Sequence, residues 1–264
     1  MIDLKQLVND LNLIREKSPL VHNITNFVAM NNTANGLLAI GASPVMAHAV
    51  EEMEDMISIS SALVINMGTL SKHWVDGMII AGKAAKTKGI PVIFDPVGVG
   101  ATPYRSETAA IIIKECKPEI IRGNASEIIS LVNTNSVTKG VDSTEKAESA
   151  IDFAKNLAAQ TGSVVSISGQ EDYITDGKIV NIVRNGSLLM PKVTGLGCTA
   201  SAITGAFAAV NKNMLEAATH AMAVMGVAGE IAAQKCDGPG SLQLHFLDTL
   251  YNLTEEMIRK TLWT

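Results

Sequence analysis

The sequence contains few aromatic and few charged residues for its length. Of its 264 residues, 4% are aromatic and 18% are charged, whereas 47% are hydrophobic. Intrinsic disorder requires low hydrophobicity with high net charge, so this composition excludes it. Average globular proteins have about 25% charged residues. A chain below that value with abundant aliphatic side chains is suited to close-packed helices and buried parallel strands.

The chain also lacks a surplus of basic residues and has only three cysteines. Lys and Arg number 21 against 26 Asp and Glu, a net charge of −5, and no run of basic residues occurs. A nucleic-acid-binding protein normally has a basic stripe, so we expect no nucleic-acid partner. Cys116, Cys198 and Cys236 are too few and too scattered for a disulfide framework or a zinc motif. The simplest interpretation is a reduced, cytoplasmic protein.

We also expect no membrane-targeting segment. The first ten residues carry Asp3, Lys5 and Asp10 where a signal peptide needs an apolar core. The longest uncharged stretch, 193–211, is interrupted by glycines. We therefore interpret it as a buried helix and expect no association with a membrane.

Apolar runs alternate with helical periodicity through most of the chain. The predicted strands are 19–25, 43–46, 62–68, 91–97, 119–123 and 163–169. The predicted helices between and before them are 4–16, 27–40, 50–58, 71–88, 106–116, 125–131 and 144–160. Apolar runs without polar alternation, separated by helices, indicate a parallel sheet covered on both faces.

The pattern changes after residue 170. Asp176-Gly177 within 172–183 is a strong hairpin signal and predicts an antiparallel addition at one sheet edge. Beyond Gly197 we predict three helices, at 198–210, 214–234 and 240–260. The chain has no long linker or repeat. We therefore predict a single α/β domain over 1–264, a layered sandwich with a mostly parallel central sheet, an antiparallel edge hairpin and a helical C-terminal third.

Polar residues or glycines follow four of the predicted strands. These strand ends are Asn66-Met67-Gly68, Asp95-Pro96-Val97-Gly98, Arg122-Gly123-Asn124 and Ser168-Gly169. In open α/β sheets, ligands bind beyond the carboxyl ends of the strands. Each segment alone is equally well an ordinary turn, but the four together predict one shared crevice.

The segment Thr194–Ser201 contains two glycines immediately before a helix of small residues. Unpaired amides and the helix dipole at such an N-terminus favour a phosphate group. The alternative is a glycine turn that lets the helix pack closely. The sequence has no Walker A motif, and Pro103 replaces the third glycine of a dinucleotide fingerprint in 98–103.

Two further residues have both a binding and a structural interpretation. Glu127 lies three positions after Asn124, so the pair forms either a capping box or a site for hydrated Mg²⁺, and spacing alone favours the cap. Arg122 offers bidentate donors to a phosphate in an otherwise acidic protein. Its alternative role is a surface arginine that covers a strand end.

Four segments, 19–46, 95–102, 122–128 and 194–201, resemble the hydroxyethylthiazole kinases of thiamine salvage, which are ribokinase-like kinases. The resemblance covers essentially the whole chain. It implies a ribokinase-like fold and transfer of the ATP γ-phosphate, with Mg²⁺, to the hydroxyl of 4-methyl-5-(2-hydroxyethyl)thiazole. It also implies a homotrimer with active sites between neighbouring subunits.

The same resemblance implies three groups of site residues. They are Met46, Gly195 and Asn26 for the thiazole alcohol, Arg122 and Ser168 for ATP, and Asp95 and Glu127 for Mg²⁺ and the phosphates.

Cys198 stands where the broader ribokinase-like pattern has the aspartate that acts as general base. A thiol has a pKa near 8.5, which a helix N-terminus can lower. Phosphoryl transfer depends mainly on positioning and charge neutralisation. Our hypothesis is that Cys198 assists catalysis while the helix N-terminus contributes more. The alternative is a small buried residue whose thiol takes no part.

Three other functions remain alternatives to thiazole phosphorylation. A ribokinase-like kinase of hydroxymethylpyrimidine is disfavoured by the long match over 19–46. An ATP-dependent dehydratase of hydrated nicotinamide cofactors is disfavoured by Cys198, because such relatives tend to keep Asp there. A non-catalytic binder is disfavoured by the intact set of Asp95, Arg122 and Glu127.

Overall fold

A computed structural model describes residues 2–134 and 147–263. Its centre is an eight-stranded sheet in the order β2-β1-β3-β4-β5-β6-β7-β8. The strands are β1 (Leu20–Ile24), β2 (Ser43–Val45), β3 (Ala62–Asn66), β4 (Val92–Asp95), β5 (Ile120–Asn124), β6 (Val164–Ser168), β7 (Asp172–Thr175) and β8 (Val180–Val183). Strands β1 to β6 are parallel, and β7 and β8 add antiparallel at one edge, which confirms the predicted α/β class and hairpin.

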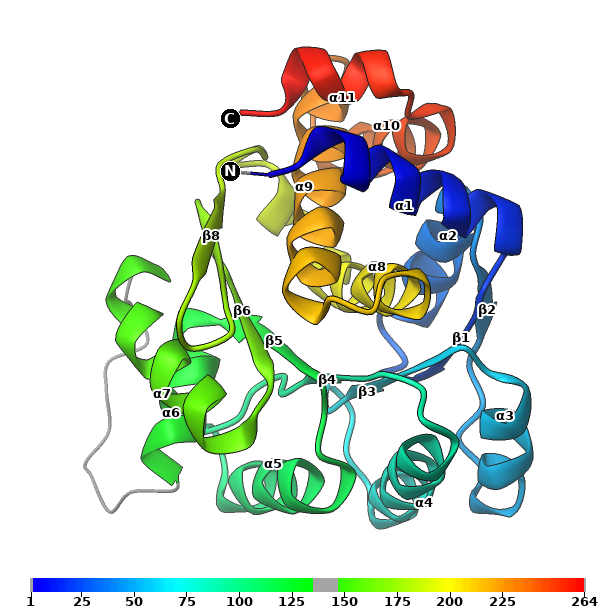
Figure 1. The fold of residues 1–264 in the computed structure, drawn as a ribbon, viewed down its shortest axis with the longest axis vertical. Helices are drawn as coiled ribbons and strands as arrows, with labels where there is room; N and C mark the ends of the chain where they lie inside the picture. The colour runs from blue at the N-terminus through cyan, green and yellow to red at the C-terminus, as the bar shows by residue number, and fades with distance from the viewer. Residues whose placement is uncertain (1, 135–146, 264) are drawn as a thin grey trace.

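Helices cover both faces of the sheet (Figure 1). One face is covered by α3 (Met53–Ile59), α4 (Lys72–Lys88), α5 (Pro103–Cys116), α6 (Ala125–Thr134) and α7 (Ile151–Thr161). The other is covered by α1 (Leu4–Lys17), α2 (Met30–Ile40), α8 (Leu196–Val210), α9 (Met214–Ala233), α10 (Pro239–Asn252) and α11 (Glu255–Thr261). None of the helices in the described ranges is long and apolar enough to cross a membrane.

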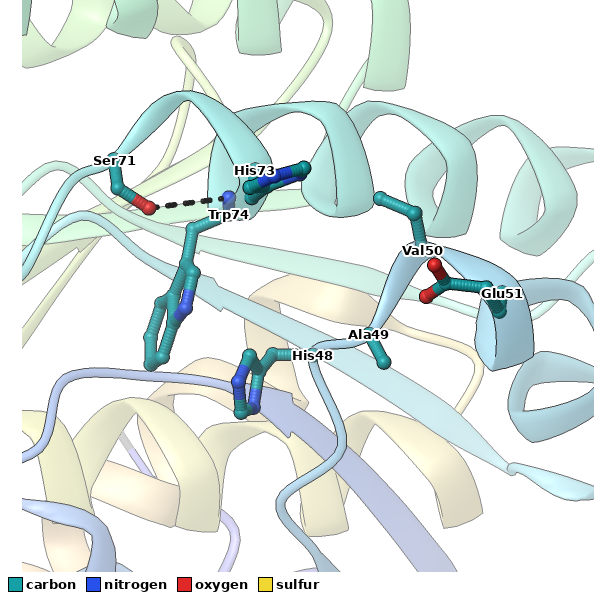
Figure 2. Close-up of a pocket in the computed structure, with 7 residues that line it drawn as sticks. All are labelled: His48, Ala49, Val50, Glu51, Ser71, His73 and Trp74. Carbon is teal, nitrogen blue, oxygen red and sulfur yellow. Dashed lines mark hydrogen bonds between the residues drawn. The ribbon is translucent and has the colours of Figure 1, made fainter.

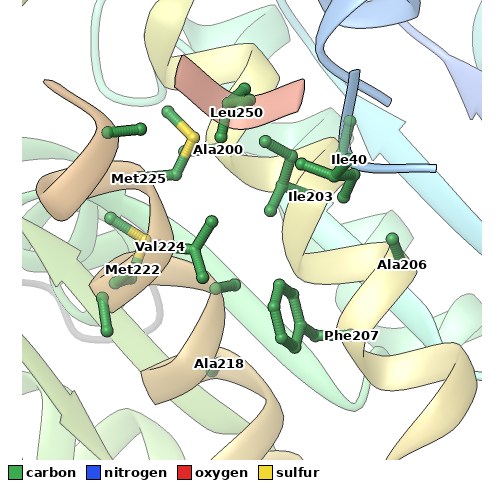
Figure 3. Close-up of a cluster of buried hydrophobic side chains, with 14 of the residues drawn as sticks. Ile40, Ala200, Ile203, Ala206, Phe207, Ala218, Met222, Val224, Met225 and Leu250 are labelled. Atoms are coloured by element: carbon green, nitrogen blue, oxygen red, sulfur yellow. The ribbon is translucent and has the colours of Figure 1, made fainter. Parts of the chain in front are cut away.

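Because side chains point alternately to the two faces along each strand, the hydrophobic core consists of two clusters, one on each face of the sheet. In β3, Ala62 and Val64 join the cluster under α8, whereas Leu63 and Ile65 join the cluster on the opposite face. Between α8 and α9 the core side chains are mostly small or flexible, and Phe207 is the one aromatic ring among the labelled residues (Figure 3). The charge-free stretch 193–211 therefore forms a buried helix, as predicted, because its apolar residues pack on the sheet and on α9.

Two helix predictions are wrong in detail. The segment 240–260 is two helices, because α10 ends at Asn252 and Thr254 caps α11 by accepting a hydrogen bond from the Met257 amide (3.3 Å). The helix predicted over 144–160 starts at Ile151, after a short 3₁₀ turn at Ala147–Ala150. Residues 144–146 of that prediction lie outside the described ranges.

Candidate functional site

Three polar side chains from neighbouring strands point to the same side of the sheet at its carboxyl edge. Asn66, Asp95 and Arg122 end or nearly end β3, β4 and β5, and their exposed fractions are 1%, 2% and 6%. The residues two positions earlier in these strands all belong to the hydrophobic cluster on the α8 side: Val64, Ile93 and Ile120. Since side chains alternate along a strand, the three polar groups face the beginning of α8.

The N-terminus of α8 is not capped by a side chain. Gly195 occupies the N-cap position in the left-handed region (φ +83°), and no side chain accepts a bond from the first amides. The preceding turn is held by Asn32, whose Nδ2 donates to the Thr194 carbonyl (2.8 Å). A fifteen-residue helix that begins with open amides carries a partial positive charge directed at the strand ends. This local geometry is suited to binding an anion.

Arg122 places a buried cation beside the same helix end. A Cβ added to Gly197 would lie 3.6 Å from Nη1 of Arg122, so the guanidinium runs along the first turn of α8. Its Nη1 lies 3.5 Å from the Ser201 hydroxyl, while its buried Nε has no partner among the described residues. An unpaired buried donor costs free energy unless a ligand or water satisfies it. The surface role considered for Arg122 is therefore excluded.

Asp95 is buried next to this cation. Its Oδ2 accepts hydrogen bonds from Asn66 Nδ2 (2.8 Å) and from the Ser201 hydroxyl (2.7 Å). Burial raises the pKa of Asp95 to about 6, although the charge of Arg122 opposes this shift. The carboxylate thus carries its charge at neutral pH but begins to take up a proton in mildly acidic solution.

Cys198 lies in the first turn of α8 and is half-buried. Its Sγ accepts hydrogen bonds from Nδ2 of Asn26 and Nδ2 of Asn66, both at 3.2 Å. Burial, followed by the charge of Asp95, raises the pKa of the thiol to about 11. The expectation that this pKa is lowered is wrong, because burial and the charge of Asp95 outweigh the two amide donors and the charge of Arg122. At neutral pH the group is a thiol.

Glu127 forms the capping box that its spacing favours. Its amide donates to Asn124 Oδ1 (2.9 Å), and its Oε2 accepts from the Asn124 amide (2.8 Å). Its second oxygen, Oε1, accepts from the Gly98 amide (2.9 Å), which joins the loop after β4 to the start of α6. The cap is a structural role, and both oxygens still have lone pairs for other ligands.

Two further predicted residues, Ser168 and Met46, lie at the carboxyl ends of strands but outside this contact network. Ser168 ends β6 and is paired in register with Asn124, and its hydroxyl lies 3.4 Å from the Gly123 carbonyl. Met46 directly follows the edge strand β2, so β1 lies between it and β3. The structure thus brings Asn26, Cys198, Asp95 and Arg122 into one contact network and leaves Met46 and Ser168 at its two sides.

Several residues of the network had no role in the sequence analysis. Ser201 bridges Arg122 and Asp95, and its position one turn after Gly197 was the available signal. Arg105 donates from Nη1 to the carbonyls of Met67 (2.6 Å) and Val97 (2.7 Å), which ties the loops after β3 and β4 together. No local pattern marks Arg105, because its partners are backbone atoms far away in the sequence.

A pocket of about 400 Å³ lies between the segment after β2 and the start of α4 (Figure 2). Trp74 and His48 stand close together in it, with ring centroids 4.6 Å apart. Phe27, which follows Asn26 in the sequence, packs on Trp74 at 5.0 Å. The aromatic wall is therefore connected to the loop that carries Asn26, and the sequence analysis missed it.

No group of three or more His, Cys, Asp or Glu side chains in the described part of the chain could enclose a metal ion. A metal ion would have to be held there by fewer than three such side chains. Asp95 and Glu127 lie close enough for the charge of Glu127 to raise the pKa of Asp95. Mg²⁺ commonly binds through one or two carboxylates together with water and substrate phosphates, and the two residues fit that mode.

The chain is similar in sequence and in structure to known proteins. Residues 11–256 match the model of the hydroxyethylthiazole kinase family. The chain is 55% identical to a hydroxyethylthiazole kinase of Leptospira biflexa over 98% of its length and 97% of the relative's. It is 57% identical to one of Syntrophus aciditrophicus over 94% and 93%. It superposes on the structure of a hydroxyethylthiazole kinase protein from Pyrococcus horikoshii with a TM-score of 0.91, at 41% identity and 98% coverage of both chains.

Proposed function

The chain belongs to the hydroxyethylthiazole kinase family, and from this premise we propose that the open N-terminus of α8 and the strand ends facing it form its phosphoryl-transfer site. As a family member it is an ATP-using kinase of thiamine biosynthesis with a ribokinase-like fold. The observation that carries the proposal is the buried guanidinium of Arg122, whose Nε lacks a partner among the described residues, beside an uncapped helix.

The nucleotide side of the site centres on positive charge. Arg122 and the amides at the start of α8 hold the transferred phosphoryl group, where charge is spread over its oxygens in the transition state. Ser168 contacts ATP from the end of β6. This assignment is supported by the register that sets Ser168 beside the Arg122–Asn124 end of β5.

Asp95 and Glu127 would hold Mg²⁺ together with water and phosphate oxygens. When bound, the ion neutralises phosphate charge during transfer. Both carboxylates are already oriented by hydrogen bonds, from Asn66 and Ser201 in one case and from backbone amides in the other. Oriented carboxylates need no rearrangement to receive a cation, and this supports the assignment.

The alcohol side of the site lies toward Asn26 and Gly195. Asn26 contacts Cys198, and a Cβ at Gly195 would lie 3.4 Å from Ala29, so this loop packs closely against the first turn of α8. Met46 would bound the ring of the thiazole alcohol from the end of β2. Cys198 assists as a neutral thiol, because few molecules with a pKa of about 11 are ionised at neutral pH.

The functional unit is proposed to be a homotrimer with sites between subunits. Phe27 and Val28 follow Asn26 directly and are 63% and 66% exposed. Large apolar side chains exposed beside a binding site are typical of a surface that another chain covers. Size-exclusion chromatography with light scattering tests this: three times the chain mass supports it, and a monomer contradicts it.

The activity is tested by incubating the protein with ATP, Mg²⁺ and one alcohol at a time. Formation of ADP and the phosphate ester with 4-methyl-5-(2-hydroxyethyl)thiazole is expected. Hydroxymethylpyrimidine and a hydrated nicotinamide cofactor serve as competing substrates. ADP formed with the pyrimidine alcohol but none with the thiazole alcohol would contradict the proposal.

A further inference from the structure

Asn66 is the most completely bonded side chain in the site. Its Oδ1 accepts from Asn26 Nδ2 and from the Gly68 amide, both at 2.9 Å. Its Nδ2 donates to Asp95 Oδ2 (2.8 Å) and to Cys198 Sγ (3.2 Å). A primary amide has two N–H donors and two lone pairs on oxygen, so all four positions are filled.

These partners fix the orientation of the Asn66 amide. A reversed amide would set its N–H groups against the N–H groups of Gly68 and Asn26, and its carbonyl against the Asp95 carboxylate. Asn66 is 1% exposed, so water cannot compensate for such a reversal. The close approach also requires the glycine, because a Cβ at Gly68 would lie 2.5 Å from Asn26 Nδ2.

The arrangement determines the direction of the proton on Cys198. The sulfur of a thiol carries one hydrogen and two lone pairs, and both lone pairs are approached by N–H donors, from Asn26 and Asn66. The S–H bond must then point away from the two buried amides. Cys198 is only half-buried, so an open side remains toward which its S–H bond can point.

We propose that Asn66 is a positioning residue, which turns Cys198 into a hydrogen-bond donor toward the reacting oxygens and holds it apart from Asp95. The proposal rests on the site assignment made above. Asn66 acts through its neighbours, because its side-chain amide nitrogen donates to both the Cys198 thiol and the Asp95 carboxylate and so stands between them. Asn26 also donates a hydrogen bond to the Cys198 sulfur, but its Nδ2 is in turn fixed by the Asn66 side-chain carbonyl. Asn66 is therefore the centre of the network.

The test compares Asn66→Ala with Asn23→Ala, a matched control. Asn23 is also a buried asparagine on the sheet, but its described bond goes only to the Val21 carbonyl. Both variants are expected to lose stability. Only Asn66→Ala is expected to lower kcat, by up to about tenfold, with a smaller change in the KM for ATP, because Arg122 and the first amides of α8 remain in place.

A second readout does not depend on turnover. The S–H stretching band of Cys198, isolated as the infrared difference between the wild type and Cys198→Ala, is expected to shift in Asn66→Ala and to stay unchanged in Asn23→Ala. Asn66→Ala should also be made in a protein that already carries Cys198→Ala. There the fold-decrease in kcat should be at least about threefold smaller than in the wild type.

An unchanged S–H band, or the same factor in both backgrounds, would overturn the proposal. If Asn66→Ala does not fold, Asn66→Leu gives the same comparison, because it keeps most of the volume and loses both donors without placing a second carboxylate beside Asp95. A wild-type protein that does not phosphorylate the thiazole alcohol would refute the proposed function instead. The infrared band would still decide the orientation of the thiol.

Discussion

The two ends of α8 each carry a buried polar cluster, and the clusters differ in how completely they are bonded. At the C-terminal end, Asn211 caps the helix and contacts Asp10 of α1, which pairs with His220 of α9. At the N-terminal end are Cys198 and Arg122. One helix therefore connects two polar clusters about 20 Å apart, given 1.5 Å of rise per residue.

The C-terminal cluster is satisfied within the chain. Asp10 Oδ1 accepts from Gln6 (2.9 Å), and its Oδ2 contacts Asn211 Nδ2 and His220 Nδ1, both at 2.7 Å. Of the buried side-chain atoms that lack a partner among the described residues, none belongs to this cluster, whereas Arg122 Nε belongs to the other. A satisfied cluster stabilises the fold, and a cluster with an open donor beside an open helix end is arranged for a ligand.

If the C-terminal cluster stabilises the fold, its removal must lower the stability of the protein. Removal without such a loss would contradict the difference drawn between the two clusters. Asp10→Ala should lower the free energy of unfolding by about 1–3 kcal/mol for each buried partner that it leaves without an acceptor, Asn211 and His220. Urea unfolding measures this, and kcat of the folded variant should stay within about twofold. Asp152→Ala, at an exposed ion pair, is the control and should change stability by less than about 0.5 kcal/mol.

The opposite behaviour is expected at the N-terminal end. Arg122→Met should lower kcat/KM for ATP by about 10²–10³, as does loss of a positioned donor to developing charge. Its stability should fall only modestly, because the charge of Arg122 partly compensates the buried carboxylate of Asp95, and the loss of activity should be the larger effect. Arg184→Met, at an exposed pair with Glu171, is the control. A variant that loses stability and keeps its affinity for ATP would assign Arg122 to the fold.

The pH dependence of stability tests whether Asp95, in the N-terminal cluster, is held for function rather than for stability. Its folded-state pKa of about 6 exceeds the value of 3.8 in an unfolded chain, so protonation favours the folded state. Its stabilising contribution is complete below about pH 4 and is lost as the pH rises through 6. Asp95→Asn should therefore gain about 1–3 kcal/mol relative to the wild type at pH 7.5 and little at pH 4. Thermal unfolding at the two pH values measures the difference.

The same substitution should remove activity. In the wild type, kcat/KM should decline as the pH falls below about 6, because protonated Asp95 no longer presents a negative charge. Equal stability of wild type and Asp95→Asn at both pH values would contradict the assignment of a strained, functional carboxylate.

Cys198 should show the smallest effect. Cys198→Ala is expected to lower kcat by about tenfold, the order of one hydrogen bond, since positioning and charge supply most of the catalysis. Cys198→Asp tests whether a carboxylate can replace the thiol. Steady-state kinetics of these variants beside Glu127→Ala decides the matter: if alanine abolishes turnover as completely as loss of Glu127 does, the assisting role is wrong.

Much of this architecture is predictable from local patterns. Apolar runs and turn residues indicate the parallel sheet, the Asp176-Gly177 hairpin and the strand ends at Asp95 and Arg122. The capping box at Asn124 and Glu127 also follows from spacing alone. Such features depend on neighbours within a few residues, which a single sequence displays.

The rest depends on contacts between distant segments. The pKa of Cys198 is set by burial and by Asp95, which lies about a hundred residues earlier. Arg105 binds carbonyls of two loops, and Asn66 joins β3 to the loop of Asn26 and to α8. The break between α10 and α11 was missed because the apolar periodicity continues across Leu253 and only Thr254 signals a new cap.

The central claim, that phosphate binds at the N-terminal end of α8, is tested most directly by hydrogen–deuterium exchange with and without ADP and Mg²⁺. The amides of Leu196, Gly197 and Cys198 have no intrahelical acceptor and should exchange fast in the free protein. Phosphate oxygens that accept from them should slow their exchange, while the amides of 211–222 should remain unchanged. Protection at 211–222 with none at 196–198 would contradict the account.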